Sequence, residues 1–259
     1  MKTVIVTGGS SGIGLATAQL FAERGYHVYE LSRHGKSAEA VSHIDCDVTQ
    51  PLQCQRAVEQ VWQQEQNIDA VVCNAGMGIA GAIEYTNLDD IHRQFDVNYF
   101  GALHITQAVL PYLRQQRRGN IIFVSSVMGV FSLPYQSFYA SSKAAINMLA
   151  SALRNEVRPF GINVSCIMPG DVHTSFTRER KTELRGADIY QRMQQSVAKM
   201  EHDEQNGMEP VAVARAIYRH AAASHPALFT TVGLSYRLLV DLQRLLPSRL
   251  VNRLIYYMY

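Results

Sequence analysis

The sequence predicts an α/β fold in which helices cover both faces of one doubly wound parallel sheet. Short apolar runs, for example at 4–6 and 68–73, lack the polar alternation of a half-exposed strand, so they predict strands buried on both faces. Helical patterns alternate with these runs, which is typical of a parallel sheet. The chain has 259 residues, 47% of them hydrophobic and 18% charged. We therefore expect one domain over residues 1–259.

Composition argues against several classes of protein. The net charge is only +2, from 24 basic and 22 acidic residues, so no strong field points to nucleic acid. The cysteines are widely spaced and predict reduced, buried thiols, with neither a metal site nor a disulfide framework. They are Cys46, Cys54, Cys73 and Cys166. A strand-like run starts at Lys2, without the pattern of a signal peptide, and no apolar run approaches the about 20 residues of a membrane span. We expect a cytoplasmic protein without a transmembrane segment.

The first strand, at 4–6, leads into a glycine-rich turn and a helical pattern over 15–24. Strand, turn and helix in this order form a cradle for nucleotide phosphates, as in a Rossmann fold. Gly8 permits the tight turn, Gly12 lets the backbone approach a pyrophosphate, and Gly14 allows the helix to pack closely on the sheet. We predict that the turn contacts the cofactor through Gly8, Ser10, Ser11, Gly12, Ile13 and Gly14.

The second strand, at 27–31, ends in Ser32 and Arg33. Dinucleotide enzymes that bind the ribose 2′-hydroxyl carry an acidic residue near this point. A hydroxyl and a guanidinium suit a 2′-phosphate better, so the sequence favours NADP(H) over NAD(H). The alternative is a solvated basic loop, because His34 and Lys36 follow.

The remaining elements follow in alternation. Val97–Tyr99 interrupts a long helical pattern, and a polar or small residue pair ends several of the strands. We expect strands at 41–44, 68–73, 119–124, 161–168 and 228–232, and helices at 52–65, 88–113, 138–157 and from 209.

Tyr139 and Lys143 are the most chemically suggestive pair. Four residues apart in a helical pattern, they share one face of the helix. A free phenol has a pKa of about 10, and a neighbouring ammonium lowers it toward the range useful for acid–base catalysis. Alone, the pair also fits an ordinary amphipathic helix.

Four motifs in order resemble the short-chain dehydrogenase/reductase family, and among its members the hydroxysteroid dehydrogenase-like enzymes. They are Thr7-Gly8-x-x-x-Gly12-x-Gly14, Asn74-Ala75-Gly76, a Ser126 that precedes Tyr139 by thirteen residues, and Tyr139-x-x-x-Lys143. The resemblance extends to about Thr174. It implies a single-domain NAD(P)-dependent oxidoreductase with a Rossmann fold and no metal. Members of the family commonly form dimers or tetramers, so the resemblance also implies an oligomer.

The resemblance also implies roles for individual residues. Tyr139 would transfer the hydroxyl proton and Ser126 would hold the substrate oxygen. Lys143 would lower the Tyr139 pKa and bind the nicotinamide ribose, and Asn98 would organise a water. Further cofactor contacts would be Asp47 and Val48 at the adenine, Asn74, Ala75 and Gly76 beside the sheet, and Pro169, Gly170, Val172 and Thr174 at the nicotinamide. An N-cap role for Thr49, before Pro51, is an equally visible interpretation of that turn.

Two segments would shape the substrate site. The charged stretch 173–209 falls where the family carries its substrate lid; Tyr190, Met193 and Met200 could face a substrate or pack the lid onto the core. The tail 234–259 alternates leucines with arginines, and it could cover the pocket, contact a partner subunit or lie on a membrane surface.

We therefore expect an NADP(H)-dependent enzyme that interconverts an alcohol and a ketone on a lipophilic substrate, such as a hydroxysteroid or bile acid. The alternatives are a non-catalytic NADP(H)-binding regulator and a reductase of a 3-oxoacyl or small polar carbonyl compound.

Overall fold

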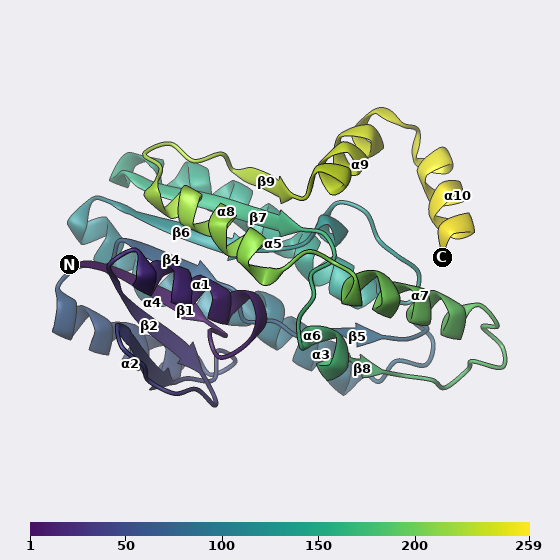
Figure 1. Cartoon of the computed structure of the whole chain (residues 1–259), viewed down its shortest axis with the longest axis horizontal. Helices are drawn as coiled ribbons and strands as arrows, with labels where there is room; N and C mark the ends of the chain where they lie inside the picture. The colour runs from purple at the N-terminus through teal and green to yellow at the C-terminus, as the bar shows by residue number, and fades with distance from the viewer.

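The computed structural model describes residues 1–259, and its centre is a seven-stranded sheet in which all neighbouring strands are parallel (Figure 1). The strand order β3-β2-β1-β4-β6-β7-β9 confirms the predicted doubly wound fold. The strands are β1 (Lys2–Thr7), β2 (Tyr26–Ser32), β3 (Val41–Asp45), β4 (Ala70–Cys73), β6 (Gly119–Val124), β7 (Ile162–Pro169) and β9 (Phe229–Val232).

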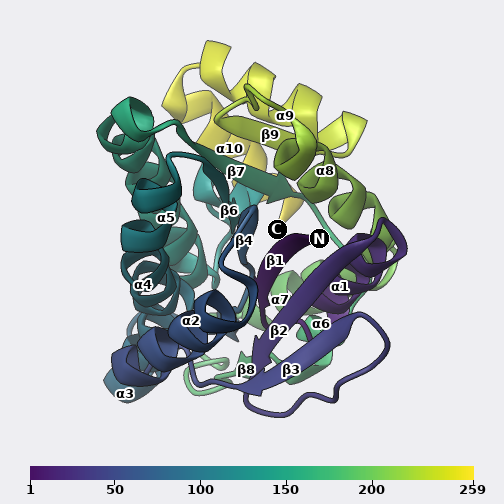
Figure 2. The same cartoon turned by 90° about the vertical axis from the view of Figure 1, so that its left-hand side faces the viewer.

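Helices cover both faces of this sheet (Figure 2). On one face lie α1 (Gly12–Glu23) and α8 (Pro210–Ala222), and on the other lie α2 (Pro51–Glu65), α4 (Gly101–Gln116) and α5 (Ser137–Val157). Alternate residues of one strand enter the two cores: Val4 and Val6 pack with Phe21 of α1, whereas Ile5 packs with Ile105 of α4. Successive residues of these strands are apolar because both faces of the sheet are buried.

The chain reverses its direction across the sheet between β1 and β4. The turns that follow these two strands meet there, since the Thr7 hydroxyl accepts hydrogen bonds from the amides of Asn74 (2.9 Å) and Ala75 (3.1 Å). The Asn74 side chain donates in turn to the carbonyls of Thr7 and Gly8. Such a switch point leaves a crevice at the carboxyl ends of the strands, where ligands of this fold class bind.

The predicted helix over 88–113 is divided into three parts. It consists of α3 (Leu88–Phe95), a π-helical turn (Asp96–Phe100) and α4, so the expected interruption at 97–99 is a change of helix type. Short 3₁₀ turns occur at Val127–Gly129 and Arg158–Phe160. Single π-turns are often found at functional sites.

The N-cap role suggested for Thr49 is wrong. Helix α2 starts at Pro51 with Gln50 as its N-cap, and no side chain caps it. The Thr49 hydroxyl instead donates to Oδ1 of Asp47 (2.8 Å), which also accepts from the Thr49 amide (2.9 Å). The side chain of Asp47 therefore organises this turn, and the Thr49 oxygen is engaged within it.

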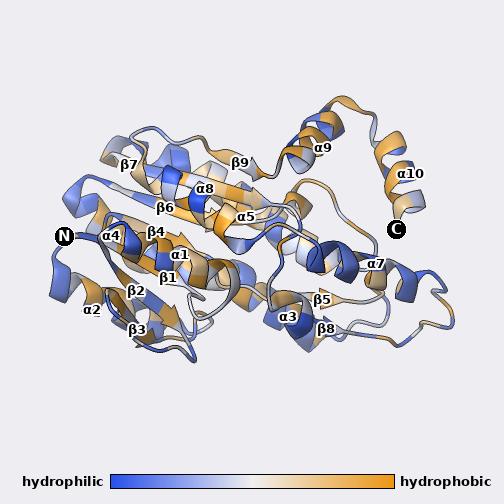
Figure 3. Ribbon diagram, in the orientation of Figure 1, coloured by the Kyte–Doolittle hydropathy of each residue, from blue (hydrophilic) through white to orange (hydrophobic).

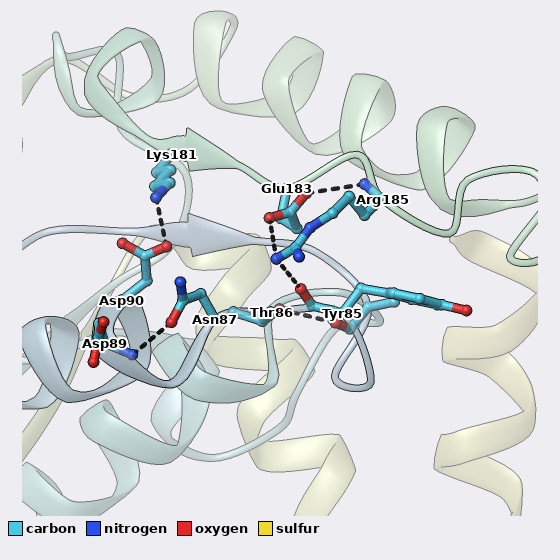
Figure 4. A network of polar contacts seen from close by, with 9 residues as sticks. Tyr85, Thr86, Asn87, Asp89, Asp90, Lys181, Glu183 and Arg185 are labelled. Carbon is cyan, nitrogen blue, oxygen red and sulfur yellow. Dashed lines mark hydrogen bonds and ion pairs between the residues drawn. The ribbon is translucent and has the colours of Figure 1, made fainter.

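The predicted lid contains α6 (Phe176–Glu179), β8 (Lys181–Thr182) and α7 (Met193–Gln205). Strand β8 pairs with β5 (Ile79–Ala80) in a separate two-stranded sheet. Figure 4 shows how this edge is fixed: Lys181 pairs with Asp90, and Arg185 contacts Glu183 and the carbonyl of Tyr85.

The lid also has a small core of its own. Met193, Val197 and Met200 are buried against Ala80 and Ala82. Met200 also lines a large cavity at the carboxyl ends of the central strands, whereas Met193 does not. Tyr190 lies outside that cavity, and its hydroxyl donates to Glu84 (2.9 Å).

The tail forms two helices, α9 (Leu234–Leu245) and α10 (Ser248–Met258), which Pro247 separates (Figure 1). Tyr236 at its start donates to Asp171 (2.5 Å), and Tyr259 at its end donates to Asp203 of α7 (3.0 Å). The tail therefore bridges the end of β7 and the lid. No helix of the chain combines the length and the apolar character needed to cross a bilayer. All four cysteines are buried, as expected.

Candidate active site

A cavity of about 1410 Å³ lies at the carboxyl ends of the central strands, between the glycine-rich turn, the lid and the tail. It collects almost every predicted site residue. The residues that line it are Gly8, Ser10, Ser11, Gly12, Ile13, Ser32, Arg33, Asp47, Val48, Asn74, Ala75, Gly76, Ser126, Tyr139, Lys143, Pro169, Gly170, Val172 and Thr174. Gly14 and Asn98 lie behind its wall.

The glycine-rich turn is shaped by close backbone contacts. Gly8 and Gly12 have left-handed φ values of +63° and +51°, which favour glycine. A Cβ on Gly14 would lie 2.1 Å from the carbonyl oxygen of Gly8, so no other residue fits there without a shift. Gly12 faces Thr174, whose Cβ would lie 3.3 Å from an added Cβ. The glycine-rich turn and the segment after β7 therefore approach each other closely, and both line the cavity.

The end of β2 presents polar groups to the same cavity. The buried Ser32 hydroxyl has no hydrogen-bond partner within the protein, and the exposed Arg33 lies next to it. The nearby Glu30 is buried outside the cavity, and its carboxylate contacts Nδ1 of His43 (2.5 Å). Burial lowers the pKa of His43, but its hydrogen bonds to Glu30 and Asp45 outweigh this and raise it above the ordinary value. The negative charge beside the turn is therefore paired.

Helix α5 holds Tyr139 and Lys143 one turn apart, as predicted. Both line the cavity, and the Lys143 Nζ lies 5.6 Å from the Tyr139 ring centroid. Nζ also donates to the carbonyl of Val124, at the end of β6 (2.9 Å). This contact ties the helix to the strand that carries the two serines.

Those two serines play different parts. The Ser125 hydroxyl donates to the main-chain oxygen of Lys143 (3.2 Å). The Ser126 Oγ accepts from the amide of Met128 (3.1 Å), so its own proton stays available to a ligand. Of the two serines, Ser126 thus keeps a hydroxyl proton toward the cavity, and its role in holding a substrate oxygen stays a prediction.

The electrostatics of Tyr139 differ from the prediction. Burial raises its pKa to about 12, and the Glu204 carboxylate adds to this, whereas the Ser126 hydroxyl and the Arg180 guanidinium act in the opposite direction. Burial also lowers the pKa of Lys143 to about 8. The expected lowering of the Tyr139 pKa is thus wrong for the protein chain itself. Desolvation sets the direction of the shift, and the phenol is a proton donor at neutral pH.

Asn98 lies in the π-helical turn and is almost fully buried. Its side-chain oxygen accepts from the amide of Met77 (2.8 Å), while its amide donates to the carbonyl of Met77 and to Ser142 (both 3.0 Å). The side chain is therefore fully occupied. A role in holding a water would fall to the main chain of this turn.

Sequence reasoning missed a buried ion pair in the lid. Arg180 pairs with Glu204, which also accepts from the Thr177 hydroxyl (2.7 Å). The Phe176 ring contacts both this pair and α5: its centroid is 5.7 Å from that of Tyr139 and 5.6 Å from the Arg180 guanidinium carbon. Burial raises the pKa values of Glu204 and Asp171, although Arg180 opposes this at Glu204. No periodicity links residues so far apart in a charged stretch, so the sequence carries no signal for the pair.

The donor set fits a nicotinamide dinucleotide. The glycine-rich turn with its left-handed Gly8 and Gly12, the unpartnered Ser32 hydroxyl and the Lys143 ammonium line one cavity. Tyr139 and Ser126 line the same cavity, and each carries a hydroxyl that can donate a hydrogen bond. Two such donors on one carbonyl oxygen would stabilise negative charge developing there.

Fold and site together define an NAD(P)-dependent oxidoreductase. The sequence profile of the short chain dehydrogenase family matches residues 2–185. The chain belongs to the short-chain dehydrogenase/reductase family. It is 39% identical over 236 residues to a 3-ketodihydrosphingosine reductase of Bacteroides thetaiotaomicron, covering 90% of this chain and 88% of that relative.

Solved structures agree on the fold. A short-chain dehydrogenase from Streptomyces avermitilis has a TM-score of 0.83 at 25% identity, over 93% of this chain and 90% of that one. Two more distant structures share the fold alone. ElxO with NADP bound has a TM-score of 0.76 at 24% identity, over 92% and 99% of the two chains. A Burkholderia phymatum enzyme in complex with NAD has 0.80 at 20%, over 93% and 92%. None of these relatives is named for a steroid.

Proposed function

We propose that the protein reduces the ketone of a long-chain lipid to a secondary alcohol, with NADPH as the hydride donor. The size and lining of the cavity carry this proposal. Its volume of about 1410 Å³ exceeds the roughly 300–1,000 Å³ of an ordinary ligand pocket, so there is room for a substrate beside a dinucleotide. Past Tyr139 the wall is largely apolar and is formed by the two tail helices, including Leu239, Val251 and Ile255. A long hydrocarbon chain matches such a wall.

The substrate's polar end would face the lid. Asp171, Asp203 and Glu204 line the cavity there, and among the lining residues of α7 only Lys199 carries a fixed positive charge. Asp203 pairs with Lys199 (3.1 Å) and Glu204 with Arg180, so Asp171 is the one carboxyl of the three with no cation within 4.0 Å. This nearly balanced polar wall suits a neutral or amino-substituted ketone better than an anionic carrier thioester. The similarity to a 3-ketodihydrosphingosine reductase supports the same substrate class and gives no particular support to a steroid.

In the reaction that we propose, the bound cofactor supplies the hydride to the carbonyl carbon. Tyr139 donates its proton to the carbonyl oxygen, and the Ser126 hydroxyl stabilises the same oxygen through a hydrogen bond. The Lys143 ammonium stabilises the phenolate left on Tyr139, and the main chain of the Asn98 turn would hold the water that returns a proton. One hydride and one proton thus convert the ketone to the alcohol.

The experiment is to follow oxidation of NADPH with a panel of carbonyl compounds. The panel holds 3-ketodihydrosphingosine, a simple long-chain ketone, a steroid ketone, a 3-oxoacyl thioester and a small polar ketone. We expect the highest kcat/KM with a long-chain ketone. A preference for the thioester or the small ketone would contradict the lipid assignment, and cofactor binding without turnover of any compound would favour a regulator.

The choice of NADP(H) depends on Ser32 and Arg33. We expect Arg33→Ala to weaken NADPH binding about 10–100-fold, because a charge-assisted hydrogen bond to a phosphate contributes about 1.5–3 kcal/mol. NADH binding should change little, since it lacks the 2′-phosphate. Fluorescence titration of both cofactors measures the two dissociation constants.

Lys36→Ala is the matched control for this prediction, because Lys36 lies in the same loop but does not line the cavity. Equal losses for NADPH and NADH, or a wild-type preference for NADH, would show that the end of β2 does not select the phosphate. The cytoplasmic location and the dimer or tetramer implied by the family stay predictions.

A further inference from the structure

The tail exposes an apolar stripe on each of its two helices. Leu234, Leu238, Leu242 and Leu245 recur at helical spacing on α9, with exposed fractions of 75%, 62%, 50% and 81%. Leu250, Leu254 and Tyr257 form a similar stripe on α10. We call these seven side chains the tail face; Figure 3 shows apolar segments on both helices. Contiguous exposed apolar patches of this kind mark interaction sites.

The tail face is continuous with the mouth of the active-site cavity. Leu242 and Leu254 are half exposed to solvent and also line the cavity, so they form a shared rim. Other residues of the same helices also line the cavity, among them Leu239 and Ile255. A hydrocarbon chain leaving the cavity past Leu242 and Leu254 would therefore meet the tail face.

Arginines flank the apolar stripes on both helices. The tail carries Arg237, Arg244, Arg249 and Arg253 against the single acidic residue Asp241, a net charge of 4 − 1 = +3. Asp241 lies within 4.0 Å of Arg237 and Arg244, whereas no carboxylate lies that close to Arg249 or Arg253. An exposed apolar stripe bordered by arginines is the pattern of a helix that lies in the interface of an anionic membrane.

We propose that the tail face docks onto an anionic lipid bilayer, with α9 and α10 in the plane of the interface, and that the cavity takes its lipid substrate directly from that bilayer. The second part rests on the proposed function. A second copy of the chain is a poorer occupant, because a symmetric pairing of two tail faces would bring the arginines of one subunit against those of the other. Anionic headgroups complement the same arginines.

The test is sedimentation of the full-length protein with two kinds of vesicle: phosphatidylcholine alone, and phosphatidylcholine mixed with phosphatidylglycerol. We expect the wild type to bind the mixed vesicles preferentially. Leu238→Gln/Leu245→Gln should lower its partition at least tenfold, because both side chains lose the apolar burial gained on docking. Arg249→Gln/Arg253→Gln should lower binding to the vesicles that contain phosphatidylglycerol by about fivefold for each arginine, and should leave binding to pure phosphatidylcholine vesicles unchanged.

A matched control is Leu52→Gln/Leu88→Gln, which removes two leucines of similar exposure, 64% and 69%, from α2 and α3. Leu238 and Leu245 do not line the cavity, so turnover of a short, soluble ketone should be unchanged in Leu238→Gln/Leu245→Gln. Turnover of a long-chain ketone embedded in vesicles should fall with vesicle binding. If no ketone is reduced but vesicle binding follows the variants, the docking surface stands and the proposed function fails.

The proposal would be overturned by a wild type that stays in the supernatant with every vesicle, or by a tail-face variant that sediments like the Leu52/Leu88 control. It would also be overturned if gel filtration showed a wild-type dimer that Leu238→Gln/Leu245→Gln dissociates while vesicle binding is absent. In that case the tail face is an interface between two copies of the chain.

Discussion

Replacing Tyr139 with Phe is expected to lower kcat for ketone reduction by about 10²–10⁴-fold, the usual contribution of a general acid. Only the phenolic oxygen is lost, and the ring can keep its contact with Phe176, 5.7 Å between centroids. NADPH binding should therefore change by less than about tenfold, since a single hydrogen bond is at stake. Steady-state kinetics give kcat, and fluorescence titration gives the NADPH dissociation constant.

Tyr135→Phe is the matched control for this substitution. Tyr135 precedes α5 closely but does not line the cavity; it packs against Tyr190 of the lid. Its replacement should leave kcat near the wild-type value. If Tyr139→Phe retained normal turnover, Tyr139 could not be the proton donor, and the mechanism would have to be reassigned to another group.

The position of Tyr139 could be predicted from the sequence, but its ionisation could not. The spacing of Tyr139 and Lys143 follows from the geometry of one helix, and a local rule suffices for it. The pKa of Tyr139 depends on burial under the lid and on Glu204, Arg180 and Asp171, which the fold brings together from distant parts of the chain. A pairwise argument from the nearest ammonium therefore gave the wrong direction.

A similar division holds for the fold. Strands buried on both faces are apolar throughout, so β1, β4 and β6 could be found from hydrophobicity alone, apart from their ends. The pairing of β8 with β5 joins two-residue strands about 100 positions apart, and no local pattern predicts it. The structure of the tail could be predicted from the sequence only in part. Its leucine periodicity predicted helices, but only the structure shows that one side lines the cavity while another is exposed.

Keeping Lys143 buried in the site has an energetic cost that depends on pH. Burial lowers the pKa of its ammonium from an ordinary 10.5 to about 8. Between these two values the unfolded chain holds one more proton than the folded protein, so the free energy of unfolding rises with pH in this window. Each pH unit of this window contributes about 1.4 kcal/mol, so the free energy of unfolding rises by about 3 kcal/mol in all. Below pH 8 both states are protonated and the contribution is constant.

We therefore expect wild type to gain about 3 kcal/mol of unfolding free energy relative to Lys143→Met between pH 8 and pH 10.5. The carbonyl of Val124 loses its donor in the variant, but that loss does not depend on pH, so it leaves the slope unchanged. Urea unfolding of both proteins across this range measures the difference. The exposed Lys36, replaced by Met in the same way, is the control, because it removes a lysine that is not buried. A difference that stays constant from pH 7 to pH 10.5 would mean that the Lys143 ammonium is not held at the expense of stability, and that its position in the site needs another explanation.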